Sequence, residues 1–210
     1  MSRFALAFAL VASLTSAASA RVATVSQMSQ MDIELPPGVM MPARTLTRAA
    51  VRAKLVEHRA QNLARFRAYQ KAGVFPSNTY QGKQLNVWID EAGHLCAAAT
   101  IIKASGQDEL VQRVGEQTNF LRLADVKQGP LMSWILTSGL TQEEISAIQA
   151  PYAYVGPTPK PDLRAAENER LAKVYKRVDD LIVKNRRASI EIAVSRVMKH
   201  PELAWQLIDS

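Results

Sequence analysis

The fold is decided by the segment FPSNTYQGKQLNVWIDEAGHLCAAATII, which runs from Phe75 to Ile102. Apolar and polar residues alternate from Leu85 to Asp90, with a bias to β-branched and aromatic side chains, and this pattern predicts a half-buried strand. A turn at residues 91–94 leads into residues 95–102, which are apolar except for one threonine. Because a run this uniform has no face suited to water, we expect it in the core.

The conformation of residues 95–102 is open, since a short apolar run fits either a buried helix or a buried strand. The three alanines at 97–99 favour a helix, whereas the Thr-Ile-Ile sequence at 100–102 favours a strand. We expect a helix, with Cys96 in its first turn. The partial positive charge at a helix N-terminus can lower the pKa of a thiol placed there.

The first twenty residues have the pattern of a secretory signal peptide. Arg3 precedes an apolar stretch at 4–14, and Ala18-Ser19-Ala20 supplies a cleavage site. We therefore expect cleavage after Ala20 and a periplasmic or secreted protein. No later apolar run approaches the ~18 residues of a membrane span, so no transmembrane span is predicted in the mature chain. The single cysteine rules out an internal disulfide framework.

Charge is unevenly distributed along this chain, whose formal net charge is +7. Residues 44–71 carry eight Lys or Arg against one acidic residue, and residues 160–200 carry eleven against six. Residues 72–159 carry five against eight. Two basic segments thus flank a slightly acidic centre, which favours an anionic envelope component or an acidic protein as partner, unless these cations only solvate helix faces. Nucleic acid is not expected as a partner of an exported protein.

The first basic segment has the pattern of a long amphipathic helix. Thr45 or Thr47 can cap its start, and Gly73 ends it. Its apolar residues recur at three- and four-residue steps and should face the core: Leu46, Ala49, Ala53, Val56, Ala60 and Leu63. The other side is expected to carry Arg48, Arg52, Arg59 and Arg65.

The second basic segment predicts a helix from Pro161 to about His200, which Pro201 ends. Its apolar stripe is interrupted at 185–187, where the sequence is Asn-Arg-Arg, so the helix is either a partner of the first or a hairpin bent at this point. The stripe consists of Leu171, Val174, Val178, Leu181, Ile182, Ile190, Val194 and Val197.

A second strand is predicted at residues 119–126, where apolar residues alternate and could pair with Leu85–Ile89. Thr141 to Glu144 has the pattern of a capping box and starts a short helix. We therefore expect an α+β fold that is mainly helical. A long N-terminal helix and a long C-terminal helix or helix hairpin would enclose a small two-stranded sheet and several short helices.

The expected organisation follows from these elements and from the prolines between them. After the signal peptide at 1–20 come a flexible lead-in at 21–43, a globular core domain at 44–150, a Pro/Tyr-rich strap or linker at 151–161, and a C-terminal helical segment at 162–210. Tyr152 and Tyr154 in the strap could contact a partner or anchor the strap to its own domain.

Cys96 and His94 are the candidate catalytic residues. Cysteine catalysis needs a thiolate and a nearby imidazole. These two side chains would point the same way in a strand and diverge in a helix, and a buried structural cysteine is the alternative. The three histidines, at 58, 94 and 200, lack the spacing of metal ligands, so neither a metal site nor a cofactor is predicted.

Two stretches resemble uncharacterised exported bacterial proteins. The first is DEAGHLCA, from Asp90 to Ala97, preceded by a basic helix and FPSNTY; the second is SGLTQEEI, from Ser138 to Ile145. The resemblance covers about half the chain and implies one folded unit at 44–150, with no activity attached to it. The expected function is that of an exported, non-enzymatic envelope or interaction protein with basic helical surfaces. The alternative is a cysteine-dependent enzyme that uses Cys96.

Overall fold

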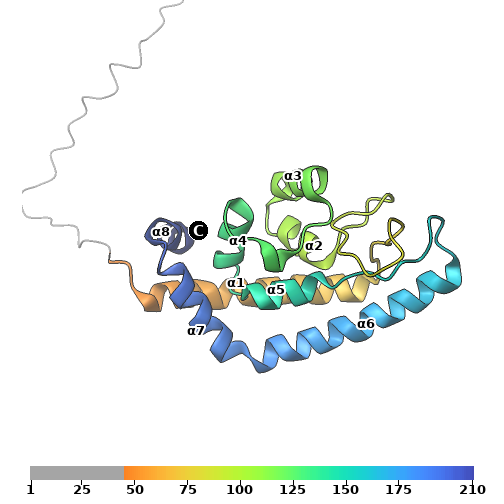
Figure 1. The fold of residues 1–210 in the computed structure, drawn as a ribbon. Helices are drawn as coiled ribbons and strands as arrows, with labels where there is room; N and C mark the ends of the chain where they lie inside the picture. Colours follow the sequence, from red (N-terminus) through yellow and green to blue (C-terminus); the bar gives the residue numbers. More distant parts are fainter. Residues whose placement is uncertain (1–44) are drawn as a thin grey trace, which may run out of the picture. The chain divides into compact units, whose positions relative to one another are not determined.

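The computed structural model describes residues 45–210 of the chain, and this part is mainly helical (Figure 1). The predicted signal peptide and lead-in lie outside the described residues. No helix within the described part is both long and apolar enough to cross a membrane. The helices are α1 (Arg48–Ala72), α2 (Ala97–Ala104), α3 (Asp108–Thr118), α4 (Pro130–Thr137), α5 (Gln142–Gln149), α6 (Pro161–Lys184), α7 (Arg186–Val197) and α8 (Pro201–Asp209), with a 3-10 turn, η2, at Leu123–Asp125.

Helix α1 begins and ends where its sequence predicts. The Thr47 hydroxyl accepts a hydrogen bond from the Ala50 N–H at 3.1 Å, and Gly73 ends the helix in the left-handed conformation. The predicted apolar stripe is correct only in part: Leu46, Val56 and Leu63 are partly buried and pack against the cores, whereas the alanines at 49, 53 and 60 are exposed. The buried face is instead formed by Val51, Leu55, Arg59, Asn62, Phe66 and Tyr69.

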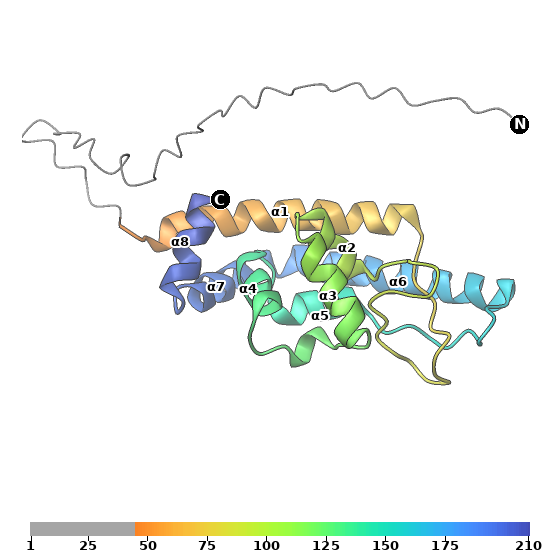
Figure 2. The same cartoon turned by 90° about the horizontal axis from the view of Figure 1, so that it is seen from above.

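Helix α6 runs along α1 and α5, and α2, α3 and α4 lie on the other side of them (Figures 1 and 2). The main core contains side chains from the central segment, the strap and α6, including Trp88, Tyr152 and Tyr175. A smaller core lies between the first half of α1 and the last two helices, where Val51 and Leu55 pack with Val194 and Leu207. The C-terminal helices therefore dock on the rest of the described chain.

The predicted two-stranded sheet is wrong. Within residues 45–210 the extended backbone forms only isolated bridges, between Asn78 and Tyr154, Leu85 and Tyr152, and Ile89 and Leu95.

The Asn119 side chain limits the pairing of this segment with residues 119–126, because it binds the backbone of Ile89. Its amide accepts a hydrogen bond from the Ile89 N–H at 2.9 Å and donates one to the Ile89 carbonyl at 3.0 Å. One side chain thus satisfies both backbone groups of Ile89, which a neighbouring strand would have bound. Beyond it, the chain turns into η2 rather than continuing as the second strand.

The helix expected in the central run is confirmed, since α2 begins at Ala97. Cys96 is its N-cap, and Leu95 before it forms the bridge with Ile89. Five of the six apolar residues of α2, at 97–99 and 101–102, are buried, as the uniform sequence of 95–102 requires.

The strap after α5 lies against the described domain through its first tyrosine. Tyr152 is fully buried and exchanges two backbone hydrogen bonds with Leu85, at 2.9 and 3.0 Å. The Glu167 carboxylate of α6 accepts a hydrogen bond from the Ala153 N–H at 2.8 Å. Tyr154 remains 39% exposed, so only this tyrosine of the pair is open to a partner.

Candidate functional site

Cys96, the candidate nucleophile, is fully buried at the start of α2. Its sulfur accepts a hydrogen bond from the Ala99 N–H at 3.3 Å, the helix-terminus contact that favours a thiolate. Burial has the larger effect and raises the pKa of the thiol to about 12. At neutral pH the group is therefore a protonated thiol packed among alanines.

His94 is directed to Asp90. Its ring nitrogen Nδ1 lies 3.0 Å from Asp90 Oδ2, and the same carboxylate accepts hydrogen bonds from the N–H groups of Ser77, Ala92 and His94. Asp90 thus fixes the turn that leads into α2. No hydrogen bond joins His94 to Cys96 within the part of the chain that the structure describes, so the two candidate catalytic residues are not brought together as a dyad.

Three buried tyrosines lie close to the thiol. The hydroxyls of Tyr152 and Tyr175 are 3.1 Å apart, and the ring of Tyr69 packs edge-on against that of Tyr175 with centroids 5.7 Å apart. Burial raises the pKa of all three phenols above the ordinary value. Among residues 45–210 no group of three or more His, Cys, Asp or Glu is placed to hold a metal ion.

Much of the basic charge predicted for the surface of α1 is neutralised by acidic residues of the later helices. The Arg67 guanidinium donates two hydrogen bonds to Asp179 of α6, at 2.9 and 3.0 Å. Both Arg48 and Arg52 pair with Glu191 of α7. The charge imbalance between segments therefore overstates the basic surface, because these partners are more than a hundred residues apart.

Three of the cations that keep no acidic partner among residues 45–210 lie close together where α6 meets α7. Lys184, Arg186 and Arg187 are exposed, and none of them pairs with a carboxylate among the described residues. Two aliphatic side chains beside them are also open to solvent: Leu181 is 54% exposed and Val183 is 50% exposed. We call these five residues the basic corner.

A cleft opens between the basic corner and α1. It has a volume of about 480 Å³ and is lined by Arg52, Val56, Lys184, Arg186, Arg187 and Ile190. Its lining thus combines four cationic and two aliphatic side chains and has no acidic member. Such a lining suits an anionic group.

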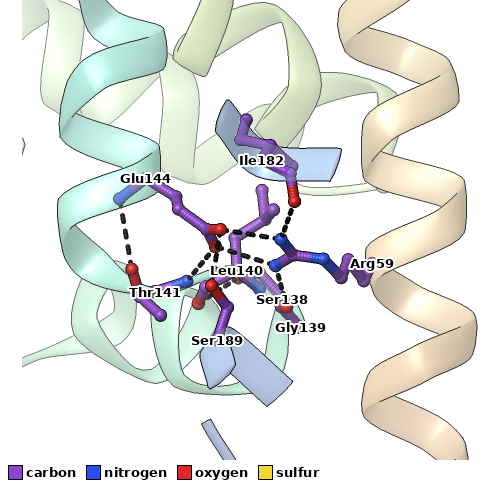
Figure 3. A network of polar contacts seen from close by, with 8 residues as sticks. All are labelled: Arg59, Ser138, Gly139, Leu140, Thr141, Glu144, Ile182 and Ser189. Atoms are coloured by element: carbon purple, nitrogen blue, oxygen red, sulfur yellow. Dashed lines mark hydrogen bonds and ion pairs between the residues drawn. The ribbon is translucent and has the colours of Figure 1, made fainter. Parts of the chain in front are cut away.

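A buried ion pair lies on the inner side of the same junction (Figure 3). Arg59 of α1 donates two hydrogen bonds to the Glu144 carboxylate of α5, each 2.7 Å long, and both side chains are almost fully buried. Glu144 also accepts a hydrogen bond from the Thr141 N–H, while the Thr141 hydroxyl accepts one from the Glu144 N–H. The predicted capping box is therefore confirmed, and its carboxylate holds a buried guanidinium as well.

The ion pair positions the basic corner from both sides. Arg59 donates to the carbonyl of Ile182 in the last turn of α6 at 2.7 Å, and the Ser189 hydroxyl of α7 donates to Glu144 at 2.7 Å (Figure 3). The break at Asn185 lies between these two anchors. Sequence reasoning identified Glu144 through its capping box but placed Arg59 on the polar face of α1.

A second basic recess, of about 840 Å³, lies where α4 and α8 begin. Lys127, Arg196, Lys199 and His200 line it together with Glu202 and several apolar residues. The Glu202 carboxylate in this recess would repel an anion, whereas the cleft beside the basic corner is lined by no carboxylate. That cleft is therefore the better candidate for an anion site.

Comparison of the chain with protein-family models, with curated proteins and with solved structures finds no match. The resemblance of the DEAGHLCA run to exported bacterial proteins therefore stays a prediction.

Proposed function

We propose that this protein is exported and docks on anionic phospholipid surfaces of the envelope through its basic corner. The observation that carries the proposal is that three cations without an acidic partner among residues 45–210 and two exposed aliphatic side chains lie between residues 181 and 187, at one helix junction. Cations beside apolar side chains are the composition of a protein surface that lies at the headgroup level of a membrane. The signal peptide predicted at residues 1–20 supports export to the envelope.

The expected strength follows from charge and burial together. Each Lys or Arg near an anionic bilayer contributes about 1 kcal/mol at low salt. Leu181 and Val183 are two residues apart on α6 and point to nearly opposite sides of it, so an interface that covers the exposed half of one of them gains about 1 kcal/mol from it. Binding of this kind is moderate and reversible, and it weakens as salt screens the charges.

Rigidity of the corner also supports the proposal. Loose cations lose side-chain and backbone entropy when they bind, which reduces the net gain. Here the backbone on both sides of the break is tied to Arg59 and Glu144. The three cations are therefore presented together by a fixed backbone.

The test is co-sedimentation of the protein, with residues 1–20 removed, with phosphatidylglycerol-containing vesicles and with neutral phosphatidylcholine vesicles. We expect binding to the anionic vesicles that falls as NaCl rises from tens to hundreds of millimolar. Replacement of Lys184, Arg186 and Arg187 by Gln should weaken partitioning about 100-fold, the equivalent of about 3 kcal/mol.

The matched control replaces by Gln three exposed cations elsewhere that have no acidic partner in the described part of the chain: Lys83, Arg113 and Lys160. It loses the same net charge and should bind within about threefold of the unchanged protein. Equal losses in the two variants would show that net charge alone drives binding. Failure of the unchanged protein to bind anionic vesicles at low salt would reject the membrane proposal.

A further inference from the structure

We infer that the cleft between α1 and the basic corner binds a single phosphomonoester group, as carried by a lipid headgroup or by a small phosphate compound. This inference rests on the proposed function and adds a discrete binding site to the membrane-facing surface. Its basis is the cleft itself: Arg52 on α1 lies across it from Lys184, Arg186 and Arg187, and no acidic side chain lines it.

The lining suits a phosphate better than a carboxylate. Three of its four cations are arginines, whose planar guanidinium groups donate two parallel hydrogen bonds to phosphate oxygens. A phosphomonoester carries close to two negative charges and three acceptor oxygens at neutral pH. Four cations on two sides of a cleft can therefore engage it more completely than a singly charged group.

The floor of the cleft strengthens this electrostatic interaction. Ile190 is 2% exposed and Val56 is partly buried, and both belong to or pack against the smaller core. Aliphatic walls exclude water, so a charge near them interacts more strongly with the surrounding cations than it would on an open surface. The volume of about 480 Å³ is large enough for a phosphate together with a glycerol-sized substituent.

Glu191 is the competitor for this site. Its carboxylate pairs with Arg52 and with Arg48, and only Arg52 lines the cleft. The pair is exposed, with side-chain exposures of 41% for Arg52 and 50% for Glu191, so a bound phosphate can displace the carboxylate at little cost. Removal of the carboxylate should therefore improve phosphate binding, an effect opposite in sign to that of removing Arg52.

The experiment is calorimetric titration of the protein with glycerol 3-phosphate and with inorganic phosphate at low ionic strength. We expect one site per chain. Arg52→Gln should weaken it at least about tenfold, the scale of a charge-assisted hydrogen bond, and Glu191→Gln should tighten it several-fold. Arg48→Gln is the matched control, because it loses the same charge and the same Glu191 contact outside the cleft, and it should change affinity less than about twofold.

Vesicles containing phosphatidic acid, compared with phosphatidylglycerol vesicles of equal surface charge, identify the source of the phosphate. If the protein prefers phosphatidic acid and Arg52→Gln abolishes this preference, the site binds a lipid headgroup. If the protein binds the phosphate compounds in solution but has no such preference, the site binds a free phosphate compound. If neither phosphate compound binds, or if Arg52→Gln binds like the unchanged protein, the inference is rejected. Arg52 lies outside the basic corner, so the protein can fail these tests of the cleft and still bind phosphatidylglycerol vesicles. Only the absence of binding to those vesicles rejects the proposed function.

Discussion

Two opposed effects act on the Cys96 thiol, and their balance decides its chemistry. The Ala99 N–H at the start of α2 stabilises negative charge on the sulfur, whereas complete burial penalises it. Desolvation of a charge is the larger effect in an apolar core. A cysteine at a helix N-terminus therefore becomes reactive only where the helix begins at a surface or a polar cleft.

We predict that Cys96 in the native protein reacts slowly with an aromatic disulfide reagent at pH 8. A pKa raised from 9.0 to about 12 lowers the thiolate fraction about a thousandfold, and burial also blocks access. Stopped-flow absorbance should show rapid reaction only after urea denaturation, with Cys96→Ser as the background control. Fast reaction of the folded protein at pH 6 would instead support the enzyme hypothesis.

Arg59 shows a limit of residue-level prediction. Its spacing from Val51 and Leu55 places it on their face of α1, but an arginine is seldom fully buried without a partner. That partner, Glu144, lies 85 residues away, and only its capping role can be read locally. The pattern therefore predicts that the alanine-rich side of α1 is buried, whereas its alanines at 49, 53 and 60 are exposed.

At the scale of the element, the starts and ends of helices followed from sequence because their causes are local. The capping box at Thr141, the stop at Gly73 and the break at Asn185 each depend on a few neighbouring residues. The absence of a sheet could not be predicted, because alternating apolar and polar residues indicate an extended segment but not the group to which its backbone is hydrogen-bonded. Here that partner is the side chain of Asn119.

The turn between α4 and α5 approaches α1 closely enough that only glycine fits at 139. A Cβ atom added there would lie 2.1 Å from the Leu55 carbonyl oxygen, and the residue has a φ of 74°. We predict that Gly139→Ala lowers the free energy of unfolding by about 3–5 kcal/mol, since overpacking adds to backbone strain. Urea unfolding followed by circular dichroism measures the change.

Gly73→Ala is the control for that substitution. Gly73 has a similar φ of 65°, but an added Cβ would meet no atom within 4 Å. Only backbone strain applies there, so the cost should be about 1 kcal/mol. Equal costs for the two substitutions would contradict the close approach of the turn to α1.

At the scale of the whole molecule, the candidate site consists of cations that remain without an acidic partner after ion pairs have formed between distant parts of the chain. The sequence predicted basic segments near both ends of the described chain, but not which cations would find acidic partners. Arg67 and Arg52 are matched with Asp179 and Glu191 through folding, and such pairs cannot be read from spacing. The basic corner becomes visible only once these pairs are known.

The buried thiol and phenols should make the protein sensitive to alkali. The pKa values of Cys96, Tyr69, Tyr152 and Tyr175 are raised in the folded state, so the native protein keeps protons that the unfolded chain releases. Stability from these groups is complete below the unfolded pKa values, near 9 for the thiol and near 10 for the phenols, and is lost as pH rises beyond them. The urea concentration at which half of the protein is unfolded should therefore decrease as the pH is raised from 9 to 11.

Tyrosinate absorbance provides an independent reading of the same effect. In the folded protein at pH 11 the three buried phenols should stay protonated, and their absorbance at 295 nm should appear only on unfolding. Tyr175→Phe keeps the ring and removes one hydroxyl, so its urea midpoint should fall less steeply with pH. If the urea midpoint stays constant or increases as the pH is raised beyond 9, the burial of these groups is contradicted.

The smaller core sets an order for biosynthesis. Val51 and Leu55, close to the start of α1, bury against residues that emerge much later, including Val194 and Leu207. While the chain is being made, these side chains cannot be fully covered until α7 and α8 have formed. A chain that lacks α7 and α8 would therefore leave this core incomplete and expose the apolar side chains of Val51 and Leu55.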